Sequence, residues 1–423
     1  MNEAPPAALG AAAAIDTGRL LDDLRALVAI PSVTGSEESV AEWCAGALEE
    51  LGLAVQIIRP DLDALRADPD WPGEEMPRTT LPVVIGRAGD PSGRRIILSG
   101  HFDVVPPGDL DSWSADPWSG LVVDGRLYGR GACDMKGGVA AILAAVRALR
   151  ASGALTAPAG ELVVALVPSE EDGGQGTLAA IRAGVRGDVA VITEPSSLDL
   201  VVAHAGALVF RLTVPGRAAH ASQRREGVSA LDNLFTLVAA LQVDEARRNE
   251  AETDPLMTAL GLPYPTIIGI VSGGEWASTV LDQVVADGRY GVRLGQSPAE
   301  AEAELRACVA AACAGDPFLR DHPASVEING GIFGSARVPS DHPLPVGLAD
   351  AAAAVTGRRP AMLGAPYGAD MRLFVDVAKT PCVIYGPGSA RQAHSADEFV
   401  PLAEVEKCAA VLAEWIRRQI AAR

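Results

Sequence analysis

The chain has 423 residues, of which 48% are hydrophobic and 21% charged, as is ordinary for a globular protein of two or three domains. Its formal net charge of -19, without any cluster of Lys and Arg, argues against nucleic acid as a partner. No apolar run reaches the roughly 18 residues of a membrane span, and the Ala-rich N-terminus lacks the basic and apolar regions of a signal peptide, so we expect a cytoplasmic protein.

The first half of the chain alternates between predicted helices and strands. Two helices are expected within residues 16–51, around a turn at 30–39, and Ser36 is the candidate cap of the second. Further helices and strands follow in alternation: strands at 55–60, 82–87 and 94–105, a helix at 137–151, a strand at 161–169, a helix at 176–183 and a strand at 188–195. This order predicts an α/β domain with a largely parallel sheet.

The pattern changes near residue 205 and returns near 325. Strands at 207–216, 266–274, 283–294 and 325–331 are interleaved with helices at 228–247 and 298–314, an order that predicts a split βαβ sandwich. A strand at 381–387 and a closing amphipathic helix at 402–418 belong again to the first fold. We therefore expect a catalytic domain in two parts, 1–204 and 325–423, with an inserted domain at 205–324.

The stretch 62–82 is a connection rich in Pro, Asp and Glu that is longer than most loops of compact domains. Loops of this length often act as lids or binding elements. It is equally compatible with a solvated surface excursion, so both interpretations stay open.

Short strings at the ends of the predicted strands carry histidine and carboxylate side chains. His101 and Asp103 in SGHFDVVP face the same side of a strand, so the imidazole can bind a metal ion while the carboxylate orients it. Glu170 and Glu171 in VPSEEDGG and Glu194 in ITEPSS also follow strands. Open α/β sheets bind ligands at these strand ends, which predicts that the side chains meet at one edge.

Two further strings complete the set. Asp134 lies in GRGACDMKGG, where glycines allow a tight turn before a helix, and His394 lies in RQAHSADEF. Alone, Asp134 would be interpreted as a helix cap and the paired glutamates as a solvated turn. Together, imidazoles and carboxylates suit zinc, cobalt or manganese, and a bridging carboxylate can hold two ions roughly 3.5 to 4 Å apart. Such a site activates water, and a carboxylate free of metal can pass the proton of that water to a leaving amine.

The six cysteines form no CxxC pair, which fits a reducing compartment. Cys133, next to Asp134, has two interpretations: a metal ligand or a small packing residue. Packing is favoured, because thiolate ligands usually occur in groups.

The strings GHFDVVP, GRGACDMKGG, SEEDGG, EP and HSADE, in this order, resemble the zinc-dependent aminoacylase and carboxypeptidase family that includes acetylornithine deacetylase, succinyl-diaminopimelate desuccinylase and glutamate carboxypeptidase. The resemblance implies a two-metal aminopeptidase-like domain with an inserted ferredoxin-like dimerisation or lid domain, and zinc ahead of cobalt or manganese. It also implies the following roles: His101, Asp134 and Glu194 on one ion, His394, Asp134 and Glu171 on the other, Glu170 as general base and Asp103 as the partner of His101.

The same resemblance extends to GRAAHAS in the inserted domain. It implies that His220 reaches across a dimer interface to stabilise the oxyanion of the intermediate, a contribution of about two to three orders of magnitude in rate. A homodimer is therefore expected. His204, His322 and His342 match no motif and are interpreted as structural.

The segments that would contact substrate depart from the family pattern. Many relatives have an Asn and then a Pro in this segment, whereas this chain has Ser278 and Thr279 near the Asn position and Asp282 near the Pro position. Thr279 is the candidate substrate contact. Arg293 matches an arginine that pairs with a substrate carboxylate, a task suited to guanidinium. In YGADMR, Gly368 belongs to a loop expected to close over the substrate, and Ala369 replaces the usual hydroxyl residue.

The resulting hypothesis is a metal-dependent amidase that removes an N-acyl group from a small amino-acid-like substrate with a free carboxylate. The alternatives within the same fold are a dipeptidase or carboxypeptidase, and an amidase for a non-amino-acid amide. A catalytically silent binding module is disfavoured, because no ligand or base has been lost. A serine hydrolase lacks its GxSxG motif here, and a P-loop is also absent.

Overall fold

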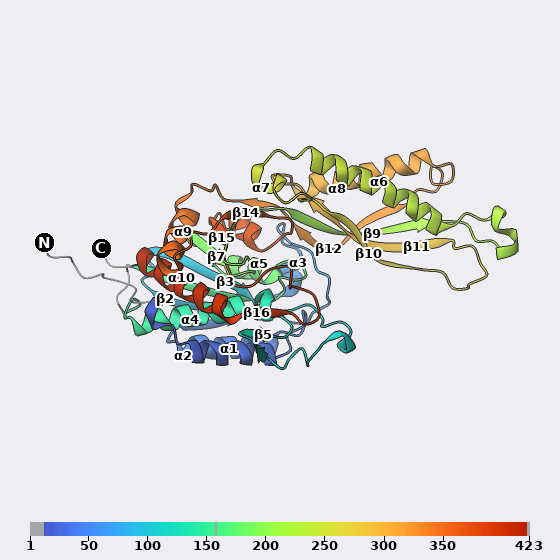
Figure 1. Cartoon of the computed structure of the whole chain (residues 1–423). Coiled ribbons are helices and arrows are strands. Elements are labelled where there is room, and N and C mark those ends of the chain that lie inside the picture. Colours follow the sequence, from blue (N-terminus) through green and yellow to red (C-terminus); the bar gives the residue numbers. More distant parts are fainter. Residues whose placement is uncertain (1–11, 157–158, 421–423) are drawn as a thin grey trace.

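A computed structural model describes residues 12–156 and 159–420. Residues 1–11, on which the expectation of no signal peptide rests, lie outside the described part. Figure 1 shows a larger α/β domain and an elongated smaller domain that projects from it. No helix within the described ranges combines the length and apolar character needed to cross a membrane.

A nine-stranded sheet forms the centre of the larger domain. Its order is β1-β2-β6-β3-β7-β15-β8-β13, and β14 also pairs with β8. The strands are β1 (Ala54–Ile58), β2 (Val83–Gly89), β3 (Arg94–His101), β6 (Gly160–Val167), β7 (Val189–Ile192), β8 (Leu200–His204), β13 (Ala336–Arg337), β14 (Met362–Ala365) and β15 (Cys382–Ile384). The four middle strands β6, β3, β7 and β15 are parallel, and antiparallel pairs flank them on both sides. This parallel centre confirms the fold expected from the alternation.

Helices cover this sheet, which is why its middle strands are continuous apolar runs. They are α1 (Thr17–Ala29), α2 (Glu38–Glu50), α3 (Leu62–Arg66), α4 (Gly137–Ala151), α5 (Gln175–Arg182), α9 (Pro343–Thr356) and α10 (Leu402–Ile420). α4 and α10 pack together over β3, with α1 against α4 and α9 against α10. α5 packs on β2 and β6, on the face of the sheet opposite α4 and α10. A right-handed crossover from β6 to β7 requires a helix on that face.

Two helix starts depend on particular residues. A Cβ on Gly138 would lie 2.1 Å from the carbonyl oxygen of Thr193, so only glycine allows α4 to begin against the end of β7. The predicted cap Ser36 is wrong: α2 begins at Glu38, and its N-cap residue is Glu37. The carboxylate of Glu37 does not cap the helix, because it accepts a hydrogen bond from the N–H of Gly35 and binds an arginine.

A small three-stranded sheet was not predicted from the sequence. It consists of β4 (Leu121–Val123), β5 (Arg126–Tyr128) and β16 (Phe399–Pro401) in the order β16-β5-β4. Because β5 precedes Asp134 and β16 follows His394, this sheet holds the two chain segments side by side. Single turns complete the larger domain: η1 (Ala12–Ala14), η2 (Leu110–Ser112), η3 (Ala132–Lys136) and η5 (Leu373–Val377).

The smaller domain is a four-stranded antiparallel sheet with helices packed on it. Its elements are β9 (Gly206–Pro215), η4 (Ala221–Glu226), α6 (Ala230–Glu250), α7 (Pro255–Thr258), β10 (Thr266–Gly273), β11 (Gln283–Val292), α8 (Pro298–Gly315) and β12 (Ser325–Phe333). The βαββαβ order with sheet order β10-β11-β9-β12 is the expected ferredoxin-like arrangement. The boundary expected at 324 is too early, because β12 pairs with β9 up to Phe333.

The 62–82 stretch contacts both domains. The carbonyl oxygen of Pro72 accepts a 2.7 Å hydrogen bond from the N–H of Ile332. The carboxylate of Glu75 accepts a 3.2 Å bond from the N–H of Gly331. Both donors lie in β12, so this connection links the catalytic domain to the inserted sheet.

Candidate metal centre

The fold brings the predicted metal ligands together around one cavity. β3, β6 and β7 are neighbours in the sheet, so His101, the Glu170–Glu171 pair and Glu194 follow adjacent strand ends. Asp134 comes from the turn before α4, and His394 from the loop between β15 and β16. The carboxylates and His394 line a cavity of about 230 Å³, together with Gly368 of the substrate-loop prediction.

Asp134 lies between the two histidines and presents one oxygen to each. Its Oδ1 is 3.2 Å from Nε2 of His101, and its Oδ2 is 3.6 Å from Nε2 of His394. Nε2 of His101 is also 3.4 Å from Oε1 of Glu194, and Nε2 of His394 is 3.0 Å from Oε2 of Glu171. These contacts connect His101 with Asp134 and Glu194, and His394 with Asp134 and Glu171. The sets of donor atoms close enough together to hold one ion are those of His101, Glu170 and Glu194 and those of His101, Asp134 and Glu171.

The orientation of His101 comes from a backbone contact. Its Nδ1 lies 2.9 Å from the carbonyl oxygen of Asp103 and 3.5 Å from the Asp103 carboxylate. An N–H at Nδ1 that donates to this carbonyl leaves Nε2 bare and directed at Asp134 and Glu194. The expected partner residue is therefore in place, but its main chain, rather than its carboxylate, makes the hydrogen bond.

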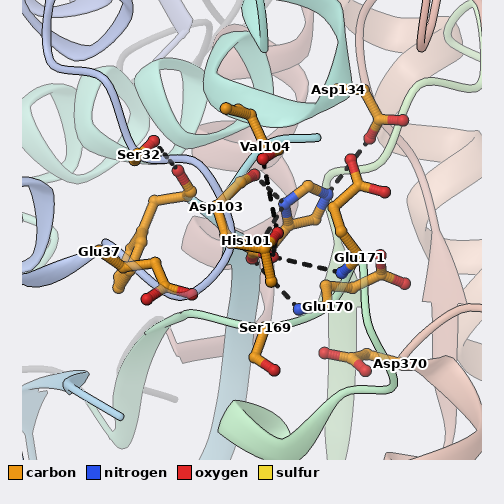
Figure 2. Close-up of polar contacts among 12 residues, drawn as sticks. Ser32, Glu37, His101, Asp103, Val104, Asp134, Ser169, Glu170, Glu171 and Asp370 are labelled. Atoms are coloured by element: carbon orange, nitrogen blue, oxygen red, sulfur yellow. Dashed lines mark hydrogen bonds and ion pairs between the residues drawn. The ribbon is translucent and has the colours of Figure 1, made fainter. Parts of the chain in front are cut away.

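The carboxylate of Asp103 has a different task. Its oxygens accept hydrogen bonds from the backbone N–H groups of Glu170 at 3.1 Å and Glu171 at 3.3 Å, and from the hydroxyl of Thr34 at 3.0 Å. Figure 2 shows the two bonds from the backbone of Glu170 and Glu171 to Asp103. Asp103 therefore fixes the backbone turn that carries Glu170 and Glu171.

The cluster holds more negative charge than its histidines can balance. Burial, with the charge of Asp134 added, raises the pKa of Glu171 to about 7 and that of Glu194 to about 8. The hydrogen bond to Glu171 raises the pKa of His394 to about 9. Oε1 of Glu194 is buried without a hydrogen bond. Buried carboxylates and imidazoles at this spacing are the donor set that borderline divalent cations prefer, so the residues fit two such ions.

Glu170 differs from the other carboxylates in its contacts. Neither histidine forms an ion pair with it, although its oxygen lies within 4.8 Å of the donor atoms of His101 and Glu194. Burial and the charge of Glu194 raise the pKa of Glu170 well above its usual range. Glu170 therefore borders the ligand group, and its carboxylate is close enough to His101 and Glu194 to share an ion with them.

Comparison with known proteins identifies the family. A family model described as peptidase family M20/M25/M40 matches residues 97–418, which include every residue of the metal centre. The chain belongs to this family. As an M20 member, it is a metal-dependent enzyme that hydrolyses amide bonds.

Relatives of the M20 chain span most of its length. Acetylornithine deacetylase of Yersinia pestis is 29% identical over 394 residues, with 90% of this chain and 92% of that protein covered. Succinyl-diaminopimelate desuccinylase of Methylorubrum extorquens is 30% identical over 408 residues, with 92% and 95% covered.

Solved structures share the M20 fold. The dipeptidase Dug1p of Saccharomyces cerevisiae has a TM-score of 0.74 at 17% identity, covering 96% of this chain and 97% of that one. The Bacillus subtilis YXEP protein, described as a dinuclear metal-binding peptidase of family M20, has a TM-score of 0.58 at 18% identity and covers 96% and 99%.

Three residues predicted from the sequence lie away from the cavity of this M20 chain. His220 is exposed, and its ring Nδ1 contacts the hydroxyl of Ser222 at 2.9 Å. It forms a β-bridge with Thr279, and both belong to the inserted domain. Arg293 pairs with Glu304 at 3.3 Å on α8 and does not line the cavity.

Two arginines that the sequence analysis did not single out contact segments that adjoin the cavity-lining residues. Arg372 is buried, donates to the carbonyl of Gly173 at 2.6 Å, and its Nε has no partner. Arg289 donates to the carbonyl of Pro366 at 3.2 Å, beside the cavity-lining Tyr367. Neither forms an ion pair within the described residues. Arg372 could have been found from the sequence, because it ends the motif YGADMR. No motif marks Arg289.

The sequence analysis also did not identify the residue that fixes the backbone at Asp134. The Glu398 carboxylate accepts hydrogen bonds from the N–H groups of Cys133 at 2.9 Å and Asp134 at 3.1 Å, and pairs with Arg130 at 2.5 Å. Glu398 is the last acidic residue of HSADEF, so the motif itself was its signal. The thiol of Cys133 is buried and donates a hydrogen bond to the carbonyl of Ser389. Burial raises the pKa of this thiol, in agreement with a packing role.

Proposed function

We propose that this enzyme removes the acyl group from an N-acyl amino acid. The observation that carries the proposal is the shared carboxylate of Asp134 between two histidine-carboxylate groups, with Glu170 beside them and outside their ion pairs. Deacetylase and desuccinylase relatives at about 30% identity favour an acyl amino acid over a peptide.

In the proposed hydrolysis, some residues of the site would bind metal ions and Glu170 would transfer the proton. Two divalent ions, zinc foremost, would be held by His101, Asp134 and Glu194 and by His394, Asp134 and Glu171, and would supply Lewis acidity toward the carbonyl and the attacking water. Glu170 accepts one proton from this water as its oxygen bonds to the carbonyl carbon. Glu170 then gives that proton to the nitrogen as the C–N bond breaks, so that an amine leaves together with a carboxylic acid, which loses its remaining proton to solvent.

A substrate panel tests the proposal. Purified protein loaded with zinc would be offered N-acetyl, N-succinyl and N-formyl amino acids beside dipeptides and simple amides. We expect kcat/KM to be highest for one of the N-acyl amino acids. The second candidate is a dipeptidase, which the likeness to the fold of Dug1p keeps open, and preference for dipeptides over every acyl amino acid would favour it.

A free carboxylate on the substrate would be bound by arginine. Arg289 and Arg372 flank the 366–372 loop without a carboxylate partner among the described residues, and a guanidinium binds a carboxylate with two parallel hydrogen bonds. We assign this contact to them in place of Arg293, whose charge is already paired with Glu304.

Replacing Arg372 or Arg289 by Gln should raise KM for an N-acyl amino acid by about 10- to 100-fold, since hydrogen bonds to charged groups contribute about 1.5 to 3 kcal/mol. The matched control is Arg293→Gln, on the same strand end as Arg289, which should leave KM unchanged. Steady-state kinetics with the substrate and with its carboxamide measure the effect. Equal losses for both compounds would contradict carboxylate binding.

The inserted domain carries features of a dimer interface. β10 is an edge strand, and its Ile270 is 63% exposed. On α6, which packs beside β10, Phe235 and Val243 are 62% and 71% exposed. An open edge with apolar side chains can pair with the same surface of a second copy around a two-fold axis. We infer a homodimer through this surface.

A dimer also gives His220 a role. His220 directly precedes η4, and Thr279 lies in the β10–β11 connection. Both segments lie at the end of the inserted domain farthest from the catalytic domain (Figure 1). In the same subunit they are remote from the cavity. We propose that they complete the site of the partner subunit, where the imidazole of His220 donates to the developing oxyanion.

Complementation between two inactive variants should reveal this sharing. A dimer of one Glu170→Gln subunit and one His220→Ala subunit contains one site with both native residues. We therefore expect activity to appear when the two inactive proteins are unfolded together and refolded, and not when either is treated alone. An inactive mixture with proven mixed dimers would show that His220 acts within its own subunit or not at all.

A further inference from the structure

A second group of buried carboxylates lies beside the 169–172 turn, outside the proposed metal ligands. Glu37, Asp103 and Asp172 are fully or almost fully buried and come from three separate segments. Burial and the neighbouring charge of Asp103 raise the pKa of Glu37 to about 7. Figure 2 shows Glu37 beside Asp103, with Asp134 and Glu171 on the far side of Asp103 from Glu37.

Arg78, from the 62–82 stretch, is the one arginine or lysine among the described residues that forms ion pairs with members of this group. Its Nη1 is 3.2 Å from Oε1 of Glu37, and its Nη2 is 3.1 Å from both carboxylate oxygens of Asp172. The side chain of Arg78 is 0% exposed. A planar guanidinium can bind two carboxylates in fixed directions, which an ammonium cannot do.

Asp172 connects Arg78 to the turn that carries the general base Glu170. Asp172 follows Glu170 and Glu171 directly, and its carboxylate accepts a hydrogen bond from the hydroxyl of Ser169 at the start of the same turn. It also accepts a 3.3 Å hydrogen bond from the N–H of Met76, two residues before Arg78 in the chain. The turn is thus fixed at two places, by Asp103 on its N–H groups and by Arg78 on Asp172.

We propose that Arg78 is a positioning residue for the general base: by binding Asp172 and Glu37 it holds the 169–172 turn so that Glu170 faces the substrate amide. This assignment rests on the proposed role of Glu170. It gives the 62–82 stretch a function that is neither a lid nor a surface excursion, since its residues Met76 and Arg78 supply part of the support of the active site.

The stretch has other anchors that provide a matched control. Arg182 pairs with Asp68 at 2.6 Å and with Asp70 at 2.5 Å, on the outer part of the same connection and without contact to the catalytic turn. If Arg78 acted only by tethering the stretch, loss of the Arg182 pairs would have a similar effect on catalysis.

The experiment compares Arg78→Gln, Arg78→Lys and Arg182→Gln in the zinc-loaded full chain. Arg78→Gln should lower kcat by about 100-fold, the effect of a small misplacement of a catalytic group, with KM and bound zinc unchanged. Arg78→Lys should restore part of kcat, because the charge remains. Arg182→Gln should keep the kcat of the wild type. Hydrogen exchange, followed by mass spectrometry, should be faster in peptides covering 169–174 only in the Arg78 variants.

If Arg78→Gln does not fold, Asp172→Asn replaces it, because the amide keeps the size of the carboxylate and weakens the same contact. A folded Arg78→Gln or Asp172→Asn protein with wild-type kcat would overturn the proposal, and so would a loss of kcat matched by loss of zinc. A wild type that hydrolyses none of the amides would instead refute the proposed function, while the exchange rates would still report whether Arg78 holds the turn.

Discussion

Replacing Glu170 by Gln should lower kcat by about 10²- to 10⁴-fold, the range that general acid-base catalysis contributes. The amide of Gln has the size of the carboxylate but cannot accept the proton of the attacking water. Because Glu170 stands outside the ion pairs of His101 and His394, the variant should keep both zinc ions. Metal analysis beside steady-state kinetics measures the two effects separately.

The control for this substitution is Glu161→Gln. Glu161 is also buried, but it lies at the opposite end of β6 and pairs with Arg95 and Arg87. Its replacement should lower stability and leave kcat unchanged. A Glu170→Gln protein that carries two ions and turns over at the wild-type rate would refute the role of Glu170, and loss of an ion would make Glu170 a ligand instead.

Replacing Asp134 by Ala should remove both metal ions, whereas replacing His394 by Ala should remove one. The difference follows from the geometry, because the two oxygens of Asp134 face the two histidines and His394 belongs to one group only. Without Asp134, both ions lose a shared ligand, and the negative charge of the remaining carboxylates is no longer neutralised by bound cations. Both activity and zinc content should therefore fall to background.

Zinc content per chain, measured by mass spectrometry after dialysis, tests this difference. His322→Ala is a suitable control, since His322 is exposed and stacks on Phe318 far from the site, and this variant should keep two ions. An Asp134→Ala protein that retains one tightly bound ion would show that Asp134 serves a single metal and does not bridge.

The sequence predicted most of the centre because its residues follow strand ends. Apolar runs such as 161–167 mark buried parallel strands, and the polar residues that follow them fall at one edge of the sheet. The helix at 137–151 was predicted with its observed bounds, since glycines mark its start. In contrast, the three-residue strands β4, β5 and β16 are too short to show any alternation.

Contacts that depend on tertiary structure could not be predicted in this way. Arg289 and Arg293 are four residues apart on one face of β11 and its extension, so alternation does not distinguish them. The packing does: Glu304 of α8 neutralises Arg293, while Arg289 reaches the 366–372 loop of the other domain. Likewise, Arg78 lay in a segment without periodicity, and only the fold shows that its charge is buried below Asp172.

The position of β15 has a consequence for the synthesis of this protein. β15 fills the place between β7 and β8, although the whole inserted domain separates it from them along the chain. On the ribosome, the inserted sheet is complete once Phe333 has emerged, while β7 and β8 still expose unpaired backbone edges to other chains. The nascent catalytic domain therefore passes through an interval in which it is open to aggregation, and the metal centre cannot be complete until His394, which follows β15, has emerged.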